Sequence, residues 1–519
     1  MSLLLLLLLL LAGGCGTLRS DVPPTPSFVL ADAEITPLGQ HVAAEAALHP
    51  ARSGFRLIVS GREAFASRVA VADLAERTLD LQYYSAADDL TTDLLLRRIE
   101  AAAQRGVRVR ILLDDIYPPT RRFARRASAL HPGIQVRLYN PFFWSDSWDP
   151  LHVGELIADA ERLNRRMHNK LWIADNAVAI VGSRNLGDAY FDVLDAGNFS
   201  DVDLLAAGPI VGDLSRAFDA FWNGVSVVPI EHLGTALNAA AAERSRQALR
   251  ARAAACEVSP SCGWLVPPTL QNEADLLRLK IGPLIWADAD MRFDLPEGEK
   301  ISVASGIEHG WIEDHPGGAR TRSELLIVSP YLVFGEDGLS HLADMRRRGL
   351  RVAVLTNSLD STDSLAAHAG YARQRAVLLA SGVELFEMRP QTASGHGRTH
   401  RWLHATAGSL HAKIVVQDRE RAIVGSLNQD PRSRLHNSEL WLTVHNAELA
   451  TELAALFDEA SDPHHAYRVE LSVAGGTRRL EWHTEEDGQA VVHRLEPASS
   501  RWLKVWRAVL GALIPEHLI

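Results

Sequence analysis

An alternation of apolar and polar residues along positions 78–84 predicts a β-strand, because successive side chains of a strand point to opposite faces of its sheet. Apolar residues then recur at helical spacing over positions 93–105, and this pattern stops at Gly106. A further apolar run at 107–113 predicts the next strand. Strand, helix and strand in this order are typical of an α/β fold, in which helices cover the faces of a sheet.

The second half of the chain repeats this order. Positions 324–331 predict a strand, positions 338–348 a helix that ends at Gly349, and positions 350–355 another strand. We therefore expect an α/β protein of two related lobes, each a mixed β-sheet flanked by helices. The expected segments are, in order, a lipoprotein-type signal peptide at 1–20, a tether and lead-in at 21–50, the first lobe at 51–235, an inter-lobe linker or insert at 236–300, the second lobe at 301–460 and a C-terminal extension at 461–519.

Composition agrees with a folded globular protein. Of the 519 residues, 47% are hydrophobic and 23% are charged, which excludes a disordered chain, a collagen-like fibre and a polytopic membrane protein. The formal net charge of -11 disfavours non-specific binding of nucleic acid, since phosphate contacts need clustered Lys and Arg. Lysine is scarce, and two of the few lysines, Lys170 and Lys413, fall in the motif described below.

The first residues read as an export signal. Leucine fills positions 3–11, a run that suits a signal peptide but is shorter than the roughly 18 apolar residues that a membrane-spanning helix needs. The small residues at 12–14 before Cys15 resemble the cleavage box of bacterial lipoproteins. This resemblance implies lipidation of Cys15 and an exported protein anchored at the periplasmic face of the membrane. An ordinary signal peptide and a wrongly assigned start are the alternatives.

The remaining cysteines are consistent with export. Cys256 and Cys262 lie close together in the sequence, and in an oxidising compartment such a pair predicts a small disulfide loop. Two unrelated thiols are the alternative. A zinc site is not expected, because two cysteines without nearby histidines do not supply four ligands.

One motif occurs once in each half of the chain. Both copies have the pattern H-x-K-x4-D-x6-G-S-x-N with identical spacing. The first copy consists of His168, Lys170, Asp175, Ser183 and Asn185, and the second of His411, Lys413, Asp418, Ser426 and Asn428. Coincidence does not explain so many matched positions, one set per lobe, and the two copies predict a single site that both lobes build.

The residue types and their spacing suit phosphodiester chemistry. Residues two apart on a strand face the same side, so each copy presents its His and Lys together. The apolar residues that follow form a hairpin, which turns near Asp175 and brings Ser183 and Asn185 back beside them. Lys, Ser and Asn donate hydrogen bonds to phosphate oxygens. Two histidines suit a two-step displacement in which one attacks phosphorus and the other protonates the leaving oxygen. The scheme requires no metal and no cofactor.

These paired motifs resemble those of the phospholipase D superfamily, and their surroundings resemble its bacterial cardiolipin synthase branch. The second resemblance rests on positions 81–84, 164–170, 184–191, 329–331 and 368–383. It implies two mixed α/β lobes with the active site at their interface, and a covalent phosphohistidine intermediate. One departure is Ser183, where many relatives in this branch have a second glycine.

The resemblance also implies a role for each motif residue. We expect His168 to be the nucleophile and His411 the general acid and base, and the reverse assignment stays open because the two copies are nearly symmetric. The aspartates of the catalytic motif, Asp175 and Asp418, have a more structural role, as their hairpin position also suggests. The expected phosphate-binding residues are Lys170, Lys413, Asn185 and Asn428, supported by Ser183 and Ser426.

An acidic residue follows each copy of the motif on a predicted strand. Asp203 follows the first and Glu439 the second. Each is expected to orient the histidine of its own lobe or of the other lobe, as carboxylates do in other His–carboxylate pairs. An edge carboxylate exposed to solvent is the alternative.

The function that the resemblance implies is phosphatidyl transfer between phospholipids, most simply to phosphatidylglycerol with cardiolipin as the product. Hydrolysis by a phospholipase D that releases phosphatidic acid is the main alternative, and a nuclease or other phosphodiesterase is a further one. A non-enzymatic binding module is disfavoured, because every motif position is intact. The expected partners are the phospholipid substrate and a membrane surface reached through the lipid anchor, without nucleic acid. One chain carries both motifs, so the site does not require an oligomer.

Two aromatic segments admit two interpretations. Phe142, Phe143, Trp144 and Trp148 precede the first motif, and an amphipathic stretch occupies positions 502–514. Each segment either contacts a membrane or packs on the protein.

Overall fold

The computed structural model describes residues 25–513 apart from 145–148, 235–236, 238, 260–261, 266–281, 297–320, 391–401, 403–406, 475–476, 487 and 499. Cys15, with the predicted leader, and Trp148 lie outside the described residues.

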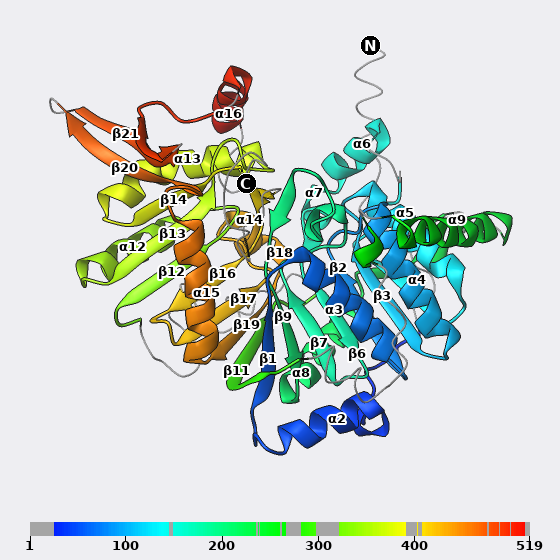
Figure 1. The fold of residues 1–519 in the computed structure, drawn as a ribbon. Coiled ribbons are helices and arrows are strands. Elements are labelled where there is room, and N and C mark those ends of the chain that lie inside the picture. The colour runs from blue at the N-terminus through cyan, green and yellow to red at the C-terminus, as the bar shows by residue number, and fades with distance from the viewer. Residues whose placement is uncertain are drawn as a thin grey trace, which may run out of the picture.

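The first lobe is a mixed sheet with helices on its faces (Figure 1). Strands β2, β3 and β4 run parallel, and the other pairs are antiparallel. In spatial order the strands are β10 (Val227–Pro229), β4 (Ile134–Tyr139), β3 (Arg108–Asp114), β2 (Thr78–Tyr83), β6 (Leu171–Ala174), β7 (Val178–Gly182), β9 (Asp203–Ala207) and β1 (Ser53–Ile58). The helices are α3 (Gly61–Leu74), α4 (Leu90–Gln104), α5 (Pro118–Leu130) and α8 (Pro209–Trp222).

The second lobe repeats this plan. Strands β12, β13 and β14 are its parallel part, and β16, β17 and β19 follow as antiparallel neighbours, as β6, β7 and β9 do in the first lobe. The strands are, in spatial order, β19 (Leu440–His445), β17 (Arg421–Gly425), β16 (Ile414–Gln417), β12 (Glu324–Val328), β13 (Arg351–Asn357), β14 (Glu384–Met388), β20 (Ala466–Ala474), β21 (Thr477–Glu486) and β22 (Gln489–His493). The helices are α12 (Glu336–Arg347), α13 (Leu365–Ala380) and α15 (Ala447–Ala460).

The predicted α/β fold of two related lobes is confirmed. Two predicted helix ends are also confirmed, because Gly106 after α4 and Gly349 after α12 have positive φ angles of 95° and 88°. Glycine adopts this left-handed conformation without the steric cost that a Cβ atom brings, so it ends a helix readily.

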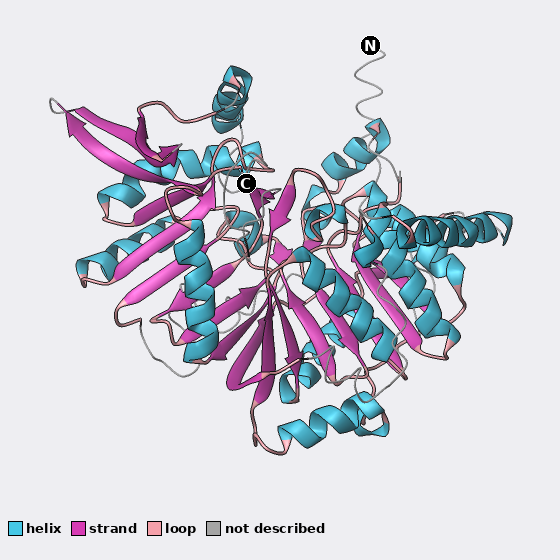
Figure 2. Ribbon diagram, viewed as in Figure 1, coloured by secondary structure: helices cyan, strands magenta, loops and turns pink. Residues whose placement is uncertain are grey.

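Strand β11 (Ile285–Phe293) joins the two sheets, which lie side by side in Figure 2. Its first residues pair with β1 and its remaining residues with β19. The strand lies within the predicted linker, and β20 of the predicted extension pairs with β14. Both segments therefore contribute to the sheets, because their backbone groups complete hydrogen bonds at strands of the two lobes.

The lobes share one hydrophobic core. Buried side chains of α8 from the first lobe and α15 from the second pack between the facing sides of the two sheets. A separate core lies under α3, α4 and α5, and another lies under α12 and α13. This shared core holds the two copies of the motif in a fixed relation to each other.

Shorter elements surround the lobes. They are η1 (Ala33–Ile35), α2 (Pro37–Ala46), α6 (Pro150–Ala158), α7 (Ala160–Leu163), β5 (Arg166–Met167), η2 (Asp188–Tyr190), β8 (Asn198–Ser200), η3 (Ile230–His232), α9 (Ala239–Glu257), η4 (Gly263–Leu265), β15 (Ala407–Leu410), α14 (Pro431–Leu435), β18 (Asn437–Ser438) and α16 (Arg501–Leu513). A disulfide joins Cys256, in the last turn of α9, to Cys262. Among the described residues, no helix combines the length and the apolar character needed to cross a membrane.

Candidate active site

Each copy of the motif is built on a β-hairpin, β6–β7 in the first lobe and β16–β17 in the second. His168 and Lys170 come just before β6 rather than on it, and Ser183 and Asn185 come just after β7. Gly182, the last residue of β7, is needed for packing, because a Cβ atom on it would lie 2.6 Å from the Cα atom of a residue in β9. The open end of each hairpin therefore carries the His, Lys, Ser and Asn side chains.

The motif aspartates lie at the opposite end of the hairpins, in their turns. Asp175 and Asp418 have positive φ angles of 52° and 55°. The buried Asp175 carboxylate accepts hydrogen bonds of 2.8 to 2.9 Å from three successive backbone N–H groups that lead into β2. Asp418 does the same for the residues that lead into β12. The two motif aspartates therefore have a structural role: they hold the hairpin turns to the neighbouring strands, as the hairpin position suggested.

Asp175→Ala should lower the free energy of unfolding of the first lobe by about 3 kcal/mol, since three N–H groups lose a charged acceptor. Urea denaturation followed by fluorescence measures the loss as a lower midpoint. Asp418→Ala is the matched variant, with a smaller expected effect because its hydrogen bonds are more exposed. A variant that kept its stability but lost turnover would contradict this structural role.

Two short parallel β-pairs bring the open ends of the hairpins together across the lobes. β5, just before His168, pairs with β18 of the second lobe, and β15, just before His411, pairs with β8 of the first. The backbone N–H of His168 donates to the Ser438 carbonyl at 2.9 Å, and that of His411 donates to the Ser200 carbonyl at 2.9 Å. Each histidine is therefore held by the strand that leads to an acidic residue of the other lobe.

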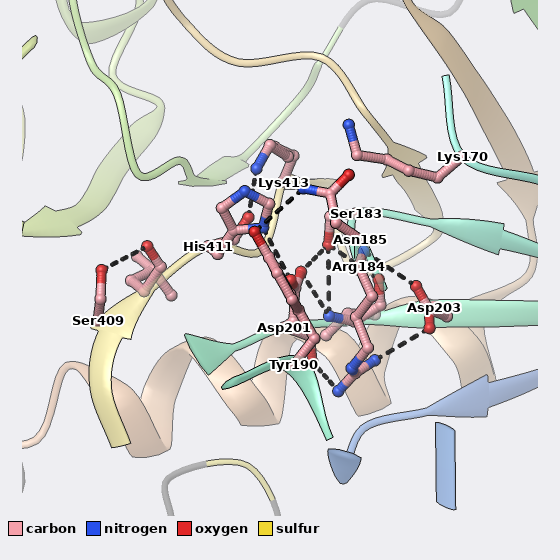
Figure 3. Close-up of polar contacts among 12 residues, drawn as sticks. Lys170, Ser183, Arg184, Asn185, Tyr190, Asp201, Asp203, Ser409, His411 and Lys413 are labelled. Carbon is pink, nitrogen blue, oxygen red and sulfur yellow. Dashed lines mark hydrogen bonds and ion pairs between the residues drawn. The ribbon is translucent and has the colours of Figure 1, made fainter. Parts of the chain in front are cut away.

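Each motif histidine makes a hydrogen bond with a carboxylate from the opposite lobe. His168 Nδ1 lies 2.9 Å from Glu439 Oε2. His411 Nδ1 lies 2.8 Å from Asp201 Oδ2, a pair shown in Figure 3. Glu439 thus lies where the sequence predicted an orienting residue. Because Nδ1 is engaged in both rings, Nε2 is the nitrogen left for a substrate.

Asp203 was predicted to orient a histidine, and this prediction is wrong. Its carboxylate lies 3.0 Å from Arg68 Nη1 and 3.3 Å from Arg184 Nη1, and Figure 3 shows it joined to Arg184 and not to His411. Asp203 is the first residue of β9, opposite Gly182, and the buried arginines behind the sheet take up its charge. The missed residue is Asp201. The dipeptides Ser200–Asp201 and Ser438–Glu439 correspond in the two lobes, and this signal would have identified it.

The two motif serines were predicted to support the phosphate, and the structure places their hydroxyls elsewhere. Ser183 Oγ donates to Asp201 Oδ1, and Ser426 Oγ donates to Glu439 Oε2. Both serines are buried and absent from the lining of the cleft described below. Each hydroxyl therefore holds a carboxylate in place for the histidine of the other lobe.

Burial sets the charge states of the histidine–carboxylate pairs. It lowers the pKa of His168 to about 3, against the opposing charge of Glu439, and it also lowers the pKa of His411. For Glu439, burial acts to raise the pKa, but contact with His168, the charge of Lys170 and the Ser426 hydroxyl lower it to about 2. These shifts favour neutral imidazoles that donate Nδ1–H to ionised carboxylates.

The motif lysines are buried at the site, where they interact with each other. Burial and then the charge of Lys413 lower the pKa of Lys170 well below its ordinary value. Burial lowers the pKa of Lys413 to about 8, although nearby carboxylates such as Asp201 oppose this. Two ammonium groups that destabilise each other would be stabilised by an anion bound between them.

A cleft of about 520 Å³ lies between the lobes, and both motif histidines line it. Asn185 and Asn428 line it too, and the side-chain Oδ1 atom of each is buried without a hydrogen-bond partner in the described structure. Four tyrosines, two aspartates and an arginine contribute to the rest of the lining: Tyr84, Tyr117, Tyr190, Tyr331, Asp363, Asp430 and Arg432. The cleft therefore surrounds two imidazoles with amide, hydroxyl and carboxylate groups and a guanidinium, a set that can bind a phosphodiester.

Comparisons with known proteins agree with this geometry. A family model described as "Cardiolipin synthase, PLD-like domain" matches residues 70–222 and 319–460, and each segment contains one copy of the motif. Cardiolipin synthase C of Escherichia coli (strain K12) is 36% identical over 481 residues, which cover 91% of this chain and 97% of that protein. An uncharacterized protein of Helicobacter pylori (strain ATCC 700392 / 26695) is 28% identical over 510 residues, with 96% of each chain covered.

A solved structure shares the fold. The crystal structure of phosphatidylserine synthase from Haemophilus influenzae Rd KW20 matches with a TM-score of 0.53 at 10% identity, covering 83% of this chain and 92% of that chain. At so low an identity the likeness shows the fold alone.

Proposed function

The chain belongs to the phospholipase D superfamily, as an enzyme of the phosphatidyltransferase type with the cardiolipin synthase PLD-like domain, and on this premise we propose that it makes cardiolipin from two molecules of phosphatidylglycerol. One observation carries the proposal. Two histidines, one from each lobe, line a single cleft, and each is fixed through Nδ1 by a carboxylate of the other lobe. The relative in Escherichia coli that bears the name cardiolipin synthase supports transfer rather than hydrolysis.

In the first step, Nε2 of His168 attacks the phosphorus of one phosphatidylglycerol. The bond from phosphorus to the glycerol oxygen breaks, and the protonated His411 gives its proton to that oxygen, so that glycerol leaves. Burial keeps His168 neutral in the empty site, so its lone pair is available for attack. The product of this step is a phosphatidyl group bound to His168.

In the second step, His411 Nε2 takes the proton from a head-group hydroxyl of a second phosphatidylglycerol. The hydroxyl oxygen attacks phosphorus, the bond to His168 breaks, and cardiolipin forms. The negative charge of the phosphodiester raises the affinity of His411 for a proton, which reverses the effect of burial in the empty cleft. We assign the non-bridging oxygens to Asn185 and Asn428, which line the cleft, and to Lys170 and Lys413. The ammonium groups of the two lysines are buried and donate at 2.5 Å to the backbone carbonyls of the two motif histidines, so they would reach the phosphate only from behind these residues.

Mass spectrometry of lipid products tests the proposal. The protein is incubated with phosphatidylglycerol vesicles, with and without phosphatidylethanolamine, and with EDTA present throughout because the scheme uses no metal. We expect cardiolipin and free glycerol. Phosphatidic acid as the sole product would mean that the enzyme hydrolyses the lipid and does not transfer the phosphatidyl group. The absence of any lipid product would contradict both transfer and hydrolysis.

The ratio kcat/KM should fall twice as the pH rises: first through the lowered pKa of His411, whose proton the leaving oxygen needs, and again, as an alkaline limb, through about 8, the pKa of Lys413. Above this pH the ammonium loses its proton, and the cleft loses positive charge that attracts the phosphodiester. The ratio kcat/KM reports groups of the free enzyme, so its pH profile is the measurement. Lys413→Arg keeps the charge and should move the alkaline limb upward. A profile that stayed flat up to the ordinary lysine pKa of about 10.4 would contradict the prediction.

We also propose that the chain is exported and anchored through a lipid on Cys15, as the small residues before this cysteine suggest. The test is incorporation of labelled palmitate in a bacterial host. Wild type should incorporate the label and Cys15→Ser should not. Equal labelling of both would refute the anchor.

A further inference from the structure

The segment that precedes the first motif exposes apolar side chains. Phe142 is buried and stacks on His152, but the next two residues, Phe143 and Trp144, are 41% and 45% exposed. In α6, which follows, Ile157 is 75% exposed, and Leu151 and Val153 are exposed as well. Aromatic and aliphatic side chains thus gather on one solvent-facing element of the first lobe.

A buried carboxylate holds this segment in place. Glu155 of α6 accepts hydrogen bonds from the backbone N–H groups of Phe143 at 2.9 Å and Trp144 at 2.7 Å. Glu155 is itself buried, and Arg162 lies 3.3 Å from it. Glu155 therefore fixes the backbone of this segment while the two aromatic rings remain exposed. The fold itself holds the rings in solvent.

The second lobe has a corresponding element in α16. Trp502, Val505, Trp506 and Val509 are exposed, with Trp502 at 72% and Trp506 at 55%. Their spacing places them on one stripe of the helix. The basic residue Lys504 is part of the same helix. The helix packs on α13, as the interpretation of this segment as protein-packed predicted. Its aromatic stripe stays exposed, as the interpretation of membrane contact requires.

A buried ion-pair cluster attaches α16 to the rim of the cleft. Glu496, just before α16, lies 2.9 Å from His368 and 2.5 Å from Arg375, both on α13, and 3.3 Å from Arg507 on α16. The first turn of α13 lines the cleft. Arg432, a cleft-lining residue of the second lobe, donates at 2.9 Å to Asn164 of the first lobe, just after α7. The exposed helix α16 is thus connected to the cleft through α13, and α6 is connected to it through α7.

The two elements lie at the same edge of the molecule. In Figure 1, α6 and α16 both project at the top, on either side of the boundary between the lobes, whereas α2 lies at the bottom. The two elements therefore project at the same edge of the molecule, one from each lobe.

We propose that Phe143, Trp144 and α6 in the first lobe and the stripe of α16 in the second form a two-part docking surface for an anionic phospholipid bilayer. The inference rests on the proposed function, since a bilayer lipid is then the substrate. Tryptophan suits the interface between head groups and acyl chains, and the phosphatidylglycerol of the proposed reaction makes such a bilayer anionic. Docking would place the mouth of the cleft against the head groups.

An environment-sensitive fluorophore tests the docking surface without relying on turnover. The full chain carries Cys15→Ser and His168→Ala, and its other two cysteines form a disulfide, so one introduced cysteine takes the label. The labelled variants are Ile157→Cys and Trp502→Cys, with Leu48→Cys as the control. Leu48 is 72% exposed and follows α2 at the opposite end of the molecule. The probes are vesicles of phosphatidylcholine with or without phosphatidylglycerol.

We expect a blue shift of the emission at positions 157 and 502 and none at 48, and a larger shift on vesicles that contain phosphatidylglycerol. No shift at 157 and 502, an equal shift at 48, or a shift at only one of the two positions would overturn the two-part surface. A shift that depended on protein concentration without vesicles would also overturn it, in favour of contact between copies of the chain.

A kinetic comparison separates docking from chemistry. Trp144→Ser with Ile157→Ser, and Trp502→Ser with Trp506→Ser, should each lower turnover of phosphatidylglycerol in vesicles about tenfold, because less apolar surface enters the bilayer. Turnover of dispersed short-chain phosphatidylglycerol should stay unchanged, as should both activities in Leu48→Ser. Equal losses on both substrates would overturn docking. If the wild type turned over neither lipid, the proposed function would fail, while the fluorophore result would still decide the surface.

Discussion

His168→Ala should lower kcat for the proposed phosphatidyl transfer by about 10⁵-fold, because in that mechanism His168 forms the covalent intermediate. His411→Ala should cause a loss of similar size with phosphatidylglycerol, since glycerol is a poor leaving group without a proton donor. Both histidines line the cleft, and each is oriented by one carboxylate. Mass spectrometry of cardiolipin formed over time is the measurement.

A donor with a good leaving group distinguishes the roles of the two histidines. A phosphatidyl ester of p-nitrophenol needs no proton on its leaving oxygen, so His411→Ala should still release p-nitrophenol in a first burst, and His168→Ala should release none. The opposite pattern would make His411 the nucleophile. His445→Ala is a suitable control, because this histidine pairs with Asp290 on the β11–β19 strands and does not line the cleft.

Asp201→Asn and Glu439→Gln should each lower kcat by about 10³- to 10⁴-fold, as the loss of the carboxylate does in other His–carboxylate pairs. The amide removes the charge that stabilises a protonated imidazole and also allows the ring to take the wrong tautomer. Each substitution acts on the histidine of the other lobe. Steady-state kinetics of each variant measures the effect.

Asp203→Asn is the matched control for Asp201→Asn, because the two residues are two positions apart in the same segment and both are buried. Asp203 pairs with Arg68 and Arg184, so its loss should lower stability by about 3 kcal/mol while the folded enzyme keeps most of its kcat. Thermal unfolding and kinetics on the same preparations separate the two effects. A loss of kcat in Asp203→Asn as large as in Asp201→Asn would contradict the assignment.

Each lobe supplies the carboxylate that orients the histidine of the other lobe, so the active site is complete only when both lobes are present. Glu439 reaches His168 and Asp201 reaches His411, so each of these two motif histidines depends on a carboxylate from the opposite lobe. The shared core of α8 and α15 and the strand β11 hold the lobes in this relation. A small shift between the lobes would therefore disturb both histidines at once.

Local patterns in the sequence were sufficient for the repeated architecture and for the residues of the doubled motif. Alternation located β2, β3, β12 and β13, and Gly106 and Gly349 marked helix ends, because these features depend on neighbours along the chain. The turn position of Asp175 followed from the same hairpin logic.

Only the tertiary structure decided which groups face the substrate. Asp201 and Asp203 are two apart and chemically alike, and their roles differ because one meets a histidine from the other lobe and the other meets buried arginines. The serine hydroxyls turn to the carboxylates for the same reason. Contacts between residues more than 200 positions apart produce no periodic pattern in the sequence. The strand pairs that join the lobes were therefore needed to assign the site.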